Sequence, residues 1–124
     1  MKAFIIKKVI EIKGGINLEN EQVIMQLISN GGNVRANSIE AIRKAIEGDF
    51  EQSQSLLDKA KESLTIAHNA QTGLIQGEIN GESEQTTLLM VHAQDHLMNA
   101  MTVNDLAKEI INYIEKKDGD NDGL

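Results

Sequence analysis

Two of the chain's three histidines, His92 and His96, lie four residues apart, with the carboxylate of Asp95 between them. On an α-helix, positions three and four residues apart share a face, so these side chains line up with Asn99. The surrounding residues are apolar, and burying titratable groups among them is costly unless they are paired or hydrogen-bonded. This cluster is therefore the first candidate for chemistry.

Spacing alone leaves three interpretations of the cluster open. The first is a satisfied polar cluster in a helix-bundle core, without any chemistry. The second is a metal site formed by His92, Asp95 and His96, because histidines at i and i+4 have a zinc-type spacing, although another helix would have to complete the ligands. The third is a histidine that carries a group covalently, because neutral imidazole is a nucleophile near pH 7 and a nearby carboxylate can fix its tautomer.

The cluster is expected to lie on one long helix, because no proline or glycine interrupts residues 82–117. Its face continues with core-type residues, which are Leu88, Val103, Leu106 and Ile110. Between residues 88 and 101, apolar side chains point nearly all round the helix, so neighbours are needed on every side. Two partner helices cover only part of this surface, which predicts a homo-oligomer with this helix at its centre.

Two further helices are predicted upstream. Apolar residues recur at helical spacing over residues 17–47 and stay in phase across Gly31-Gly32, which favours one continuous helix. Gly48 makes the turn and Asp49 caps the second helix, expected over residues 50–75, before a loop at residues 77–81. Short loops between long helices imply antiparallel neighbours, so the fold class is all-α, an up-down-up three-helix bundle.

Composition excludes several classes of function. The 124 residues carry a net charge of −7, and nucleic-acid binding needs clustered basic residues instead. No run of ~20 apolar residues is present, so no membrane insertion is expected. There is no cysteine, hence no disulfide or thiolate site, which suits a cytoplasmic location. We expect a leader of undefined structure at residues 1–16, one domain at residues 17–117 and a disordered acidic tail at residues 118–124.

Two weaker candidates lie elsewhere. His68 stands alone on the second helix, where a lone histidine is more often a core-edge residue than a ligand. Asp118, Asp120 and Asp122 match the opening of a calcium loop, but the remaining ligands and the closing glutamate are missing, so we interpret them as a solvated tail.

The residues 89–98, Leu-Met-Val-His-Ala-Gln-Asp-His-Leu-Met, closely resemble the active-site helix of lactose/cellobiose-type enzyme IIA proteins of the bacterial sugar phosphotransferase system. Ala67-His68 with Gln71-Thr72 resembles the family's second helix, and Gly48-Asp49-Phe50 resembles its first turn. The resemblance extends from about residue 21 to residue 117.

This resemblance implies a homotrimer, a nine-helix bundle, that works as a cytoplasmic phosphotransferase without a nucleotide. It implies that His92 accepts a phosphoryl group from HPr as tele-phosphohistidine and passes it to a cysteine of a cognate IIB protein, for uptake of lactose, cellobiose or chitobiose-type sugars. Gln94 and His96 are implied as supporting residues. Asp95 is implied to bind one Mg²⁺ per trimer at the three-fold axis.

Overall fold

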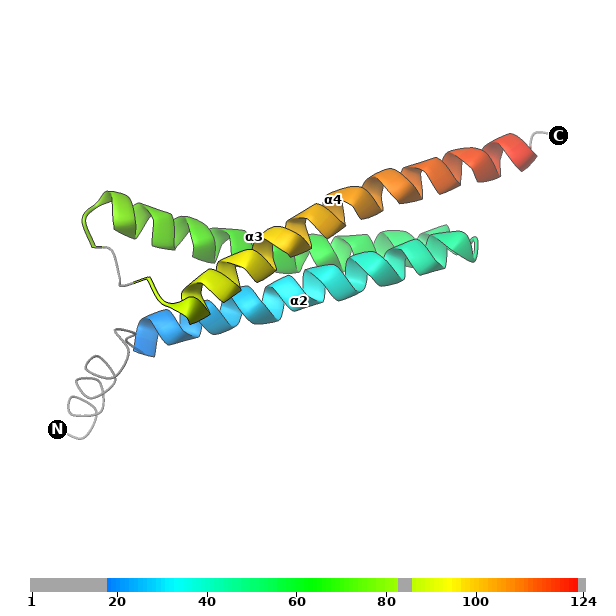
Figure 1. The fold of residues 1–124 in the computed structure, drawn as a ribbon. Coiled ribbons are helices and arrows are strands. Elements are labelled where there is room, and N and C mark those ends of the chain that lie inside the picture. Colours follow the sequence, from blue (N-terminus) through cyan, green and yellow to red (C-terminus); the bar gives the residue numbers. More distant parts are fainter. Residues whose placement is uncertain (1–17, 83–85, 123–124) are drawn as a thin grey trace.

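Three long helices make up the computed structural model, which describes residues 18–82 and 86–122. They are α2 (Leu18–Ile46), α3 (Phe50–Ile79) and α4 (Leu88–Asp122). They run up, down and up, and the C-terminal part of α4 extends beyond the turn that joins α2 to α3 (Figure 1). The predicted all-α, antiparallel three-helix fold is confirmed. The expected leader, residues 1–16, lies outside the described residues.

The helix α2 is continuous across Gly31 and Gly32, as the unbroken apolar period predicts. Two glycines inside a helix are unfavourable, because each costs about 0.5–1 kcal/mol relative to alanine. Gly31 is also buried, in the stripe of α2 that includes Leu27 and Val34. Because Gly31 weakens the helix and faces the core, we looked for the residue that packs against it.

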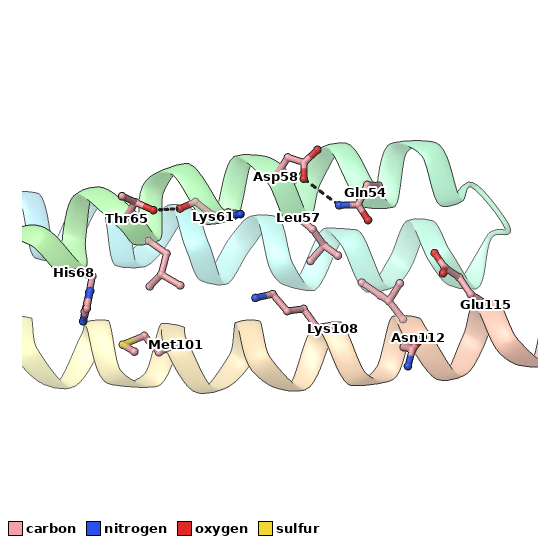
Figure 2. A pocket seen from close by; sticks show the side chains of 12 residues that line it. Gln54, Leu57, Asp58, Lys61, Thr65, His68, Met101, Lys108, Asn112 and Glu115 are labelled. Atoms are coloured by element: carbon pink, nitrogen blue, oxygen red, sulfur yellow. Dashed lines mark hydrogen bonds between the residues drawn. The ribbon is translucent and has the colours of Figure 1, made fainter.

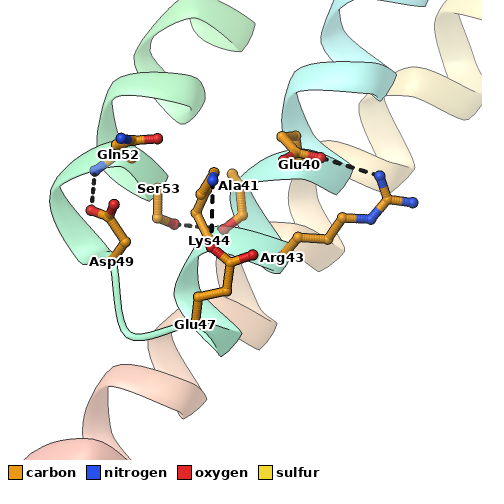
Figure 3. A network of polar contacts seen from close by, with 8 residues as sticks. All are labelled: Glu40, Ala41, Arg43, Lys44, Glu47, Asp49, Gln52 and Ser53. Atoms are coloured by element: carbon orange, nitrogen blue, oxygen red, sulfur yellow. Dashed lines mark hydrogen bonds and ion pairs between the residues drawn. The ribbon is translucent and has the colours of Figure 1, made fainter.

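The turn between α2 and α3 is fixed by local hydrogen bonds (Figure 3). Gly48 adopts a φ of 83°, which favours glycine, and the Asp49 carboxylate accepts a hydrogen bond from the Gln52 amide at 3.1 Å. Asp49 is thus the helix cap, as predicted. The buried Ser53 hydroxyl donates to the Ala41 carbonyl at 2.8 Å and ties α3 to α2.

The connection between α3 and α4 differs from the prediction. The helix α3 continues through Gly77 to Ile79, and the chain turns at Gly81 with a φ of 79°. The helix α4 begins at Leu88 and not at residue 82, because the Thr87 hydroxyl accepts a hydrogen bond from the Met90 amide at 3.1 Å and caps the first turn.

The C-terminal end of α4 is also longer than predicted. It continues past Lys117 to Asp122, so most of the segment expected to be a disordered tail is helical. Nothing in the sequence stops the helix there: no proline occurs, and Gly119 does not adopt a positive φ.

The core lies along α2, which packs against both other helices, whereas α3 and α4 meet each other at few places. Three clusters of buried side chains follow one another along the bundle, around Leu27 and Leu97, around Val34 and Ala100, and around Ala41 and Ile111. Between the last two, the fully buried Ser38 hydroxyl accepts a hydrogen bond from the Asn104 amide at 2.9 Å. The limited contact between α3 and α4 leaves an open groove on that side of the molecule.

Candidate functional site

The helix α4 presents two stripes that differ in burial. We call the first the buried stripe: it faces α2 and α3 and consists of Ala93, Leu97, Ala100, Asn104, Ala107 and Ile111. We call the second the exposed stripe: it consists of Leu88, His92, Asp95, Asn99, Leu106, Ile110 and Tyr113. Four residues of the exposed stripe directly precede a residue of the buried stripe, and one position corresponds to a turn of about 100° around the helix. These four are His92, Asn99, Leu106 and Ile110.

The core-type residues that continue the histidine face along α4 are not part of the core of a single chain. Leu88 is 86% exposed and Leu106 is 57% exposed, and Val103 is only half-buried. The core of the chain uses the small residues of the buried stripe instead, which let α4 lie close to α2. His92 and Asp95 therefore stand on an accessible surface among large apolar side chains.

The structure brings His92 and His96 together. Their ring centroids are 6.1 Å apart and the rings are inclined by 22°, so they lie nearly parallel. His92 is exposed, whereas His96 is half-buried against α2. His92 is thus the histidine that an incoming group can reach, and His96 is its neighbour on the side of the bundle.

Gln94 lies apart from this pair. Its side-chain oxygen accepts a hydrogen bond from the Gln71 amide of α3 at 2.8 Å, and the same Gln71 nitrogen lies 3.8 Å from the Met98 sulfur. Because Gln94 is two positions from His92, it projects from a different side of α4. The contact between Gln71 and Gln94 was not predicted, because residues 23 positions apart in the chain leave no local pattern.

His68 lines the groove between α3 and α4, which has a volume of about 670 Å³. Figure 2 shows its ring pointing from α3 towards α4, near Met101. Neither His92 nor His96 lines this groove. His68 therefore does not join the histidine pair.

The metal-site interpretation finds no support within a single chain. Among residues 18–82 and 86–122, no group of three or more histidine, cysteine, aspartate or glutamate side chains is close enough to hold a metal ion. His92, Asp95 and His96 share a face, but one chain does not gather them around a common point. Asp95 fits a metal site only if other copies of the chain supply further carboxylates.

In the part of the chain that the structure describes, no helix has the length and apolar character needed to span a membrane.

Known proteins share the sequence and the three-helix fold of this chain. The lichenan-specific phosphotransferase enzyme IIA component of Bacillus subtilis is 55% identical over 101 residues, covering 82% of this chain and 92% of that protein. A crystal structure of a PTS cellobiose-specific enzyme IIA from Bacillus anthracis superposes with a TM-score of 0.78 at 41% identity, covering 84% and 94% of the two chains.

A solution structure of the IIA(Chitobiose)–HPr complex from Escherichia coli contains a chain with a TM-score of 0.68 and 37% identity, covering 79% of this chain and 95% of that one. The family model "PTS system, Lactose/Cellobiose specific IIA subunit" matches residues 22–115. The chain belongs to this family of phosphotransferase components.

Proposed function

We propose that this protein is a phosphoryl carrier, which accepts a phosphoryl group from phospho-HPr on His92 and passes it to a cysteine of a cognate IIB protein. The observation that carries the proposal is the exposed imidazole of His92, supported by its ring neighbour His96, on the helix that resembles the family's active-site helix. A relative of this fold is known in complex with HPr, which supports HPr as the donor.

The chemistry requires little from the protein besides positioning. The lone pair of the unprotonated His92 Nε2 attacks phosphorus, an N–P bond forms, and the bond from phosphorus to the donor breaks with its electron pair on the donor. In the second transfer, the IIB thiolate attacks phosphorus and the electron pair of the N–P bond returns to the imidazole. Catalysis of such transfers depends mainly on alignment and charge stabilisation.

His96 is proposed to support these transfers by holding the ring of His92. Gln94 is proposed to support them differently, because its oxygen is engaged by Gln71 and its amide nitrogen remains as the hydrogen-bond donor. Since Gln94 projects away from His92 in its own chain, such a contact would reach a phosphoryl group on another copy or on a partner.

We propose a homotrimer in which the exposed stripes of three α4 helices face one another. The stripe combines four large apolar residues, which are Leu88, Leu106, Ile110 and Tyr113, and each is at least 42% exposed in one chain. Leu106, Ile110 and Tyr113 follow one another at helical spacing, and large apolar side chains grouped in this way at a surface mark an interaction site. Asp95 would then meet its two copies, and one Mg²⁺ would relieve the repulsion between the three carboxylates.

The transported sugar is proposed to belong to the lactose, cellobiose and chitobiose class, since relatives are named for lichenan, cellobiose and chitobiose. The site would operate in the cytoplasm, where the soluble phosphoryl donor is found.

Mass spectrometry after incubation with phosphoenolpyruvate, enzyme I and HPr tests the proposal. The wild type should gain one acid-labile phosphoryl group per chain. His92→Gln should gain none and keep its helical circular dichroism. His68→Gln is the matched control, because His68 lies in the α3–α4 groove, and it should accept phosphate as the wild type does. Labelling that persists in His92→Gln would refute the assignment.

A further inference from the structure

The two glycines in the middle of α2 differ from the other helix-interior glycines in what surrounds them. A Cβ atom placed on Gly73 or Gly77 of α3 would have no neighbour within 4 Å. A Cβ atom placed on Gly31 would lie 3.1 Å from the His96 Cδ2 atom, and one on Gly32 would lie 3.6 Å from the His96 Nε2 atom. The imidazole of His96 thus lies across the two glycines.

The ring, and not the helix backbone, is the neighbour that would have to shift for a side chain at Gly31. The same Cβ atom would be 3.6 Å from the His96 carbonyl oxygen and 3.6 Å from the Leu97 Cα atom. Those are ordinary van der Waals separations, so the approach of the two backbones alone would tolerate an alanine. Only the contact with the imidazole is tighter than normal packing.

The ring that occupies this space is also the near-parallel neighbour of His92, at 6.1 Å between centroids. A side chain on Gly31 would therefore displace a ring that borders the proposed phosphoryl acceptor. Because the His96 ring is half-buried against α2, displacing it by a few tenths of an ångström would change its position relative to the nearly parallel ring of His92.

We propose that Gly31 and Gly32 form a seat for the His96 ring, and that Gly31 is a positioning residue for phosphoryl transfer at His92. This inference rests on the proposed function. It also explains why α2 keeps a glycine at position 31, where alanine would otherwise give a more stable helix. The seat holds His96 at a fixed depth, and His96 in turn limits the orientations open to the His92 ring.

Gly31→Ala tests the functional part of the proposal, with Gly73→Ala as the matched control. The single-turnover rate of transfer from phospho-HPr should fall roughly 3- to 30-fold in Gly31→Ala, with no change in KM for phospho-HPr, because alignment and not docking is disturbed. The ring ¹H–¹³C signals of His92 and His96 should move in the unphosphorylated protein. Gly73→Ala should alter neither the rate nor these signals.

A thermal-stability cycle tests the contact itself, whatever the activity of the variants. Gly73→Ala should raise Tm, since alanine favours the helix, whereas Gly31→Ala should lower it. In a His96→Ala background, Gly31→Ala should raise Tm as Gly73→Ala does, because the obstructing ring is gone. This double variant also restores the fold if Gly31→Ala alone does not fold.

The outcomes separate this inference from the proposed function. If the wild type accepts no phosphate, the proposed function fails, while the stability cycle still reports on the seat. If the wild type is phosphorylated and Gly31→Ala transfers at the same rate, or loses rate only through a raised KM, the positioning role is refuted. If Gly31→Ala destabilises the chain equally without the His96 ring, the seat is refuted.

Discussion

The two stripes of α4 share one helix but serve different neighbours. The buried stripe is made of alanines with one leucine, one isoleucine and one asparagine, and it is fully enclosed by α2 and α3. The exposed stripe carries larger apolar side chains, together with His92 and Asp95. Small residues bring helices close together within the chain, whereas large residues left at the surface provide an area that a further partner can cover.

The buried stripe therefore holds the chain together, whereas the exposed stripe is where we expect the chain to interact with others. Substitutions in the buried stripe should change the stability of each chain. Substitutions in the exposed stripe should leave the chain folded and change what it assembles with, binds or carries.

Leu106→Asp should have the largest effect, by dissociating the proposed trimer. It places three like charges near one axis, and such juxtaposition costs several kcal/mol in an interface. Analytical ultracentrifugation should show a monomer, while circular dichroism should show a helical chain. Ile66→Asp on α3 is the control, since Ile66 is 50% exposed but outside the exposed stripe. A Leu106→Asp protein that stays trimeric would contradict the role given to this stripe.

Leu97→Ala should destabilise the chain itself by about 2–5 kcal/mol, because a fully buried leucine leaves a cavity. Urea unfolding followed by circular dichroism measures the loss. Met25→Ala is the control on α2, where the side chain is 55% exposed, and it should change the free energy of unfolding by about 0.5 kcal/mol or less. Equal losses in the two variants would mean that burial in one chain does not decide stability.

Much of the fold could be predicted because its signals are local. The repeat of apolar residues predicts that α2 continues across Gly31-Gly32. Asp49 caps α3 by accepting a hydrogen bond from Gln52, which is only three residues away. The prediction is wrong where two local signals compete. Gly77 was expected to lie in the loop after α3, but α3 continues through Gly77 to Ile79. The chain turns at Gly81, where the positive φ favours glycine.

The candidate site was less predictable, because it depends on which neighbours each stripe meets. Helical spacing correctly places His92 beside His96 on one face. The apolar residues of α4 did not reveal which stripe packs inside the chain, because both stripes contain apolar residues and several of these are neighbours in the sequence. Contacts between distant segments, such as His96 on Gly31 and Gln71 with Gln94, leave no trace in spacing. The roles of His92, Asp95, Gln94 and His96 stay predictions.

Ser38→Ala should cost about 1–3 kcal/mol, less than Leu97→Ala. It removes no large volume, but it deprives the buried Asn104 amide of its 2.9 Å hydrogen bond. The Asn104 Oδ1 atom already has no partner within the described residues, so the variant leaves the whole side chain unsatisfied. Urea unfolding measures the effect, and Ser55→Ala, at an exposed position on α3, should be nearly neutral. Loss of transfer activity in the folded Ser38→Ala protein would contradict a purely structural role for the hydrogen bond between Ser38 and Asn104.

Asp95→Leu should have the smallest effect on the fold and still remove the proposed metal. Asp95 is exposed within one chain, so the chain does not depend on it for packing. In the proposed trimer, three carboxylates repel one another without a cation, and replacing them with apolar side chains is often neutral or stabilising. Elemental analysis should find one Mg²⁺ per wild-type trimer and none in Asp95→Leu, which should remain trimeric.

Asp105→Leu is the control for this variant, because Asp105 is an exposed acid of α4 outside the exposed stripe, and it should keep the metal. A monomeric Asp95→Leu protein would show that the ion holds the chains together, so the apolar residues of the exposed stripe would not suffice. Metal retained in Asp95→Leu would place the ion elsewhere. In the first case, the exposed stripe would need the charge of Asp95, and not only its apolar surface, to assemble. In the second case, the exposed stripe would not be the metal site.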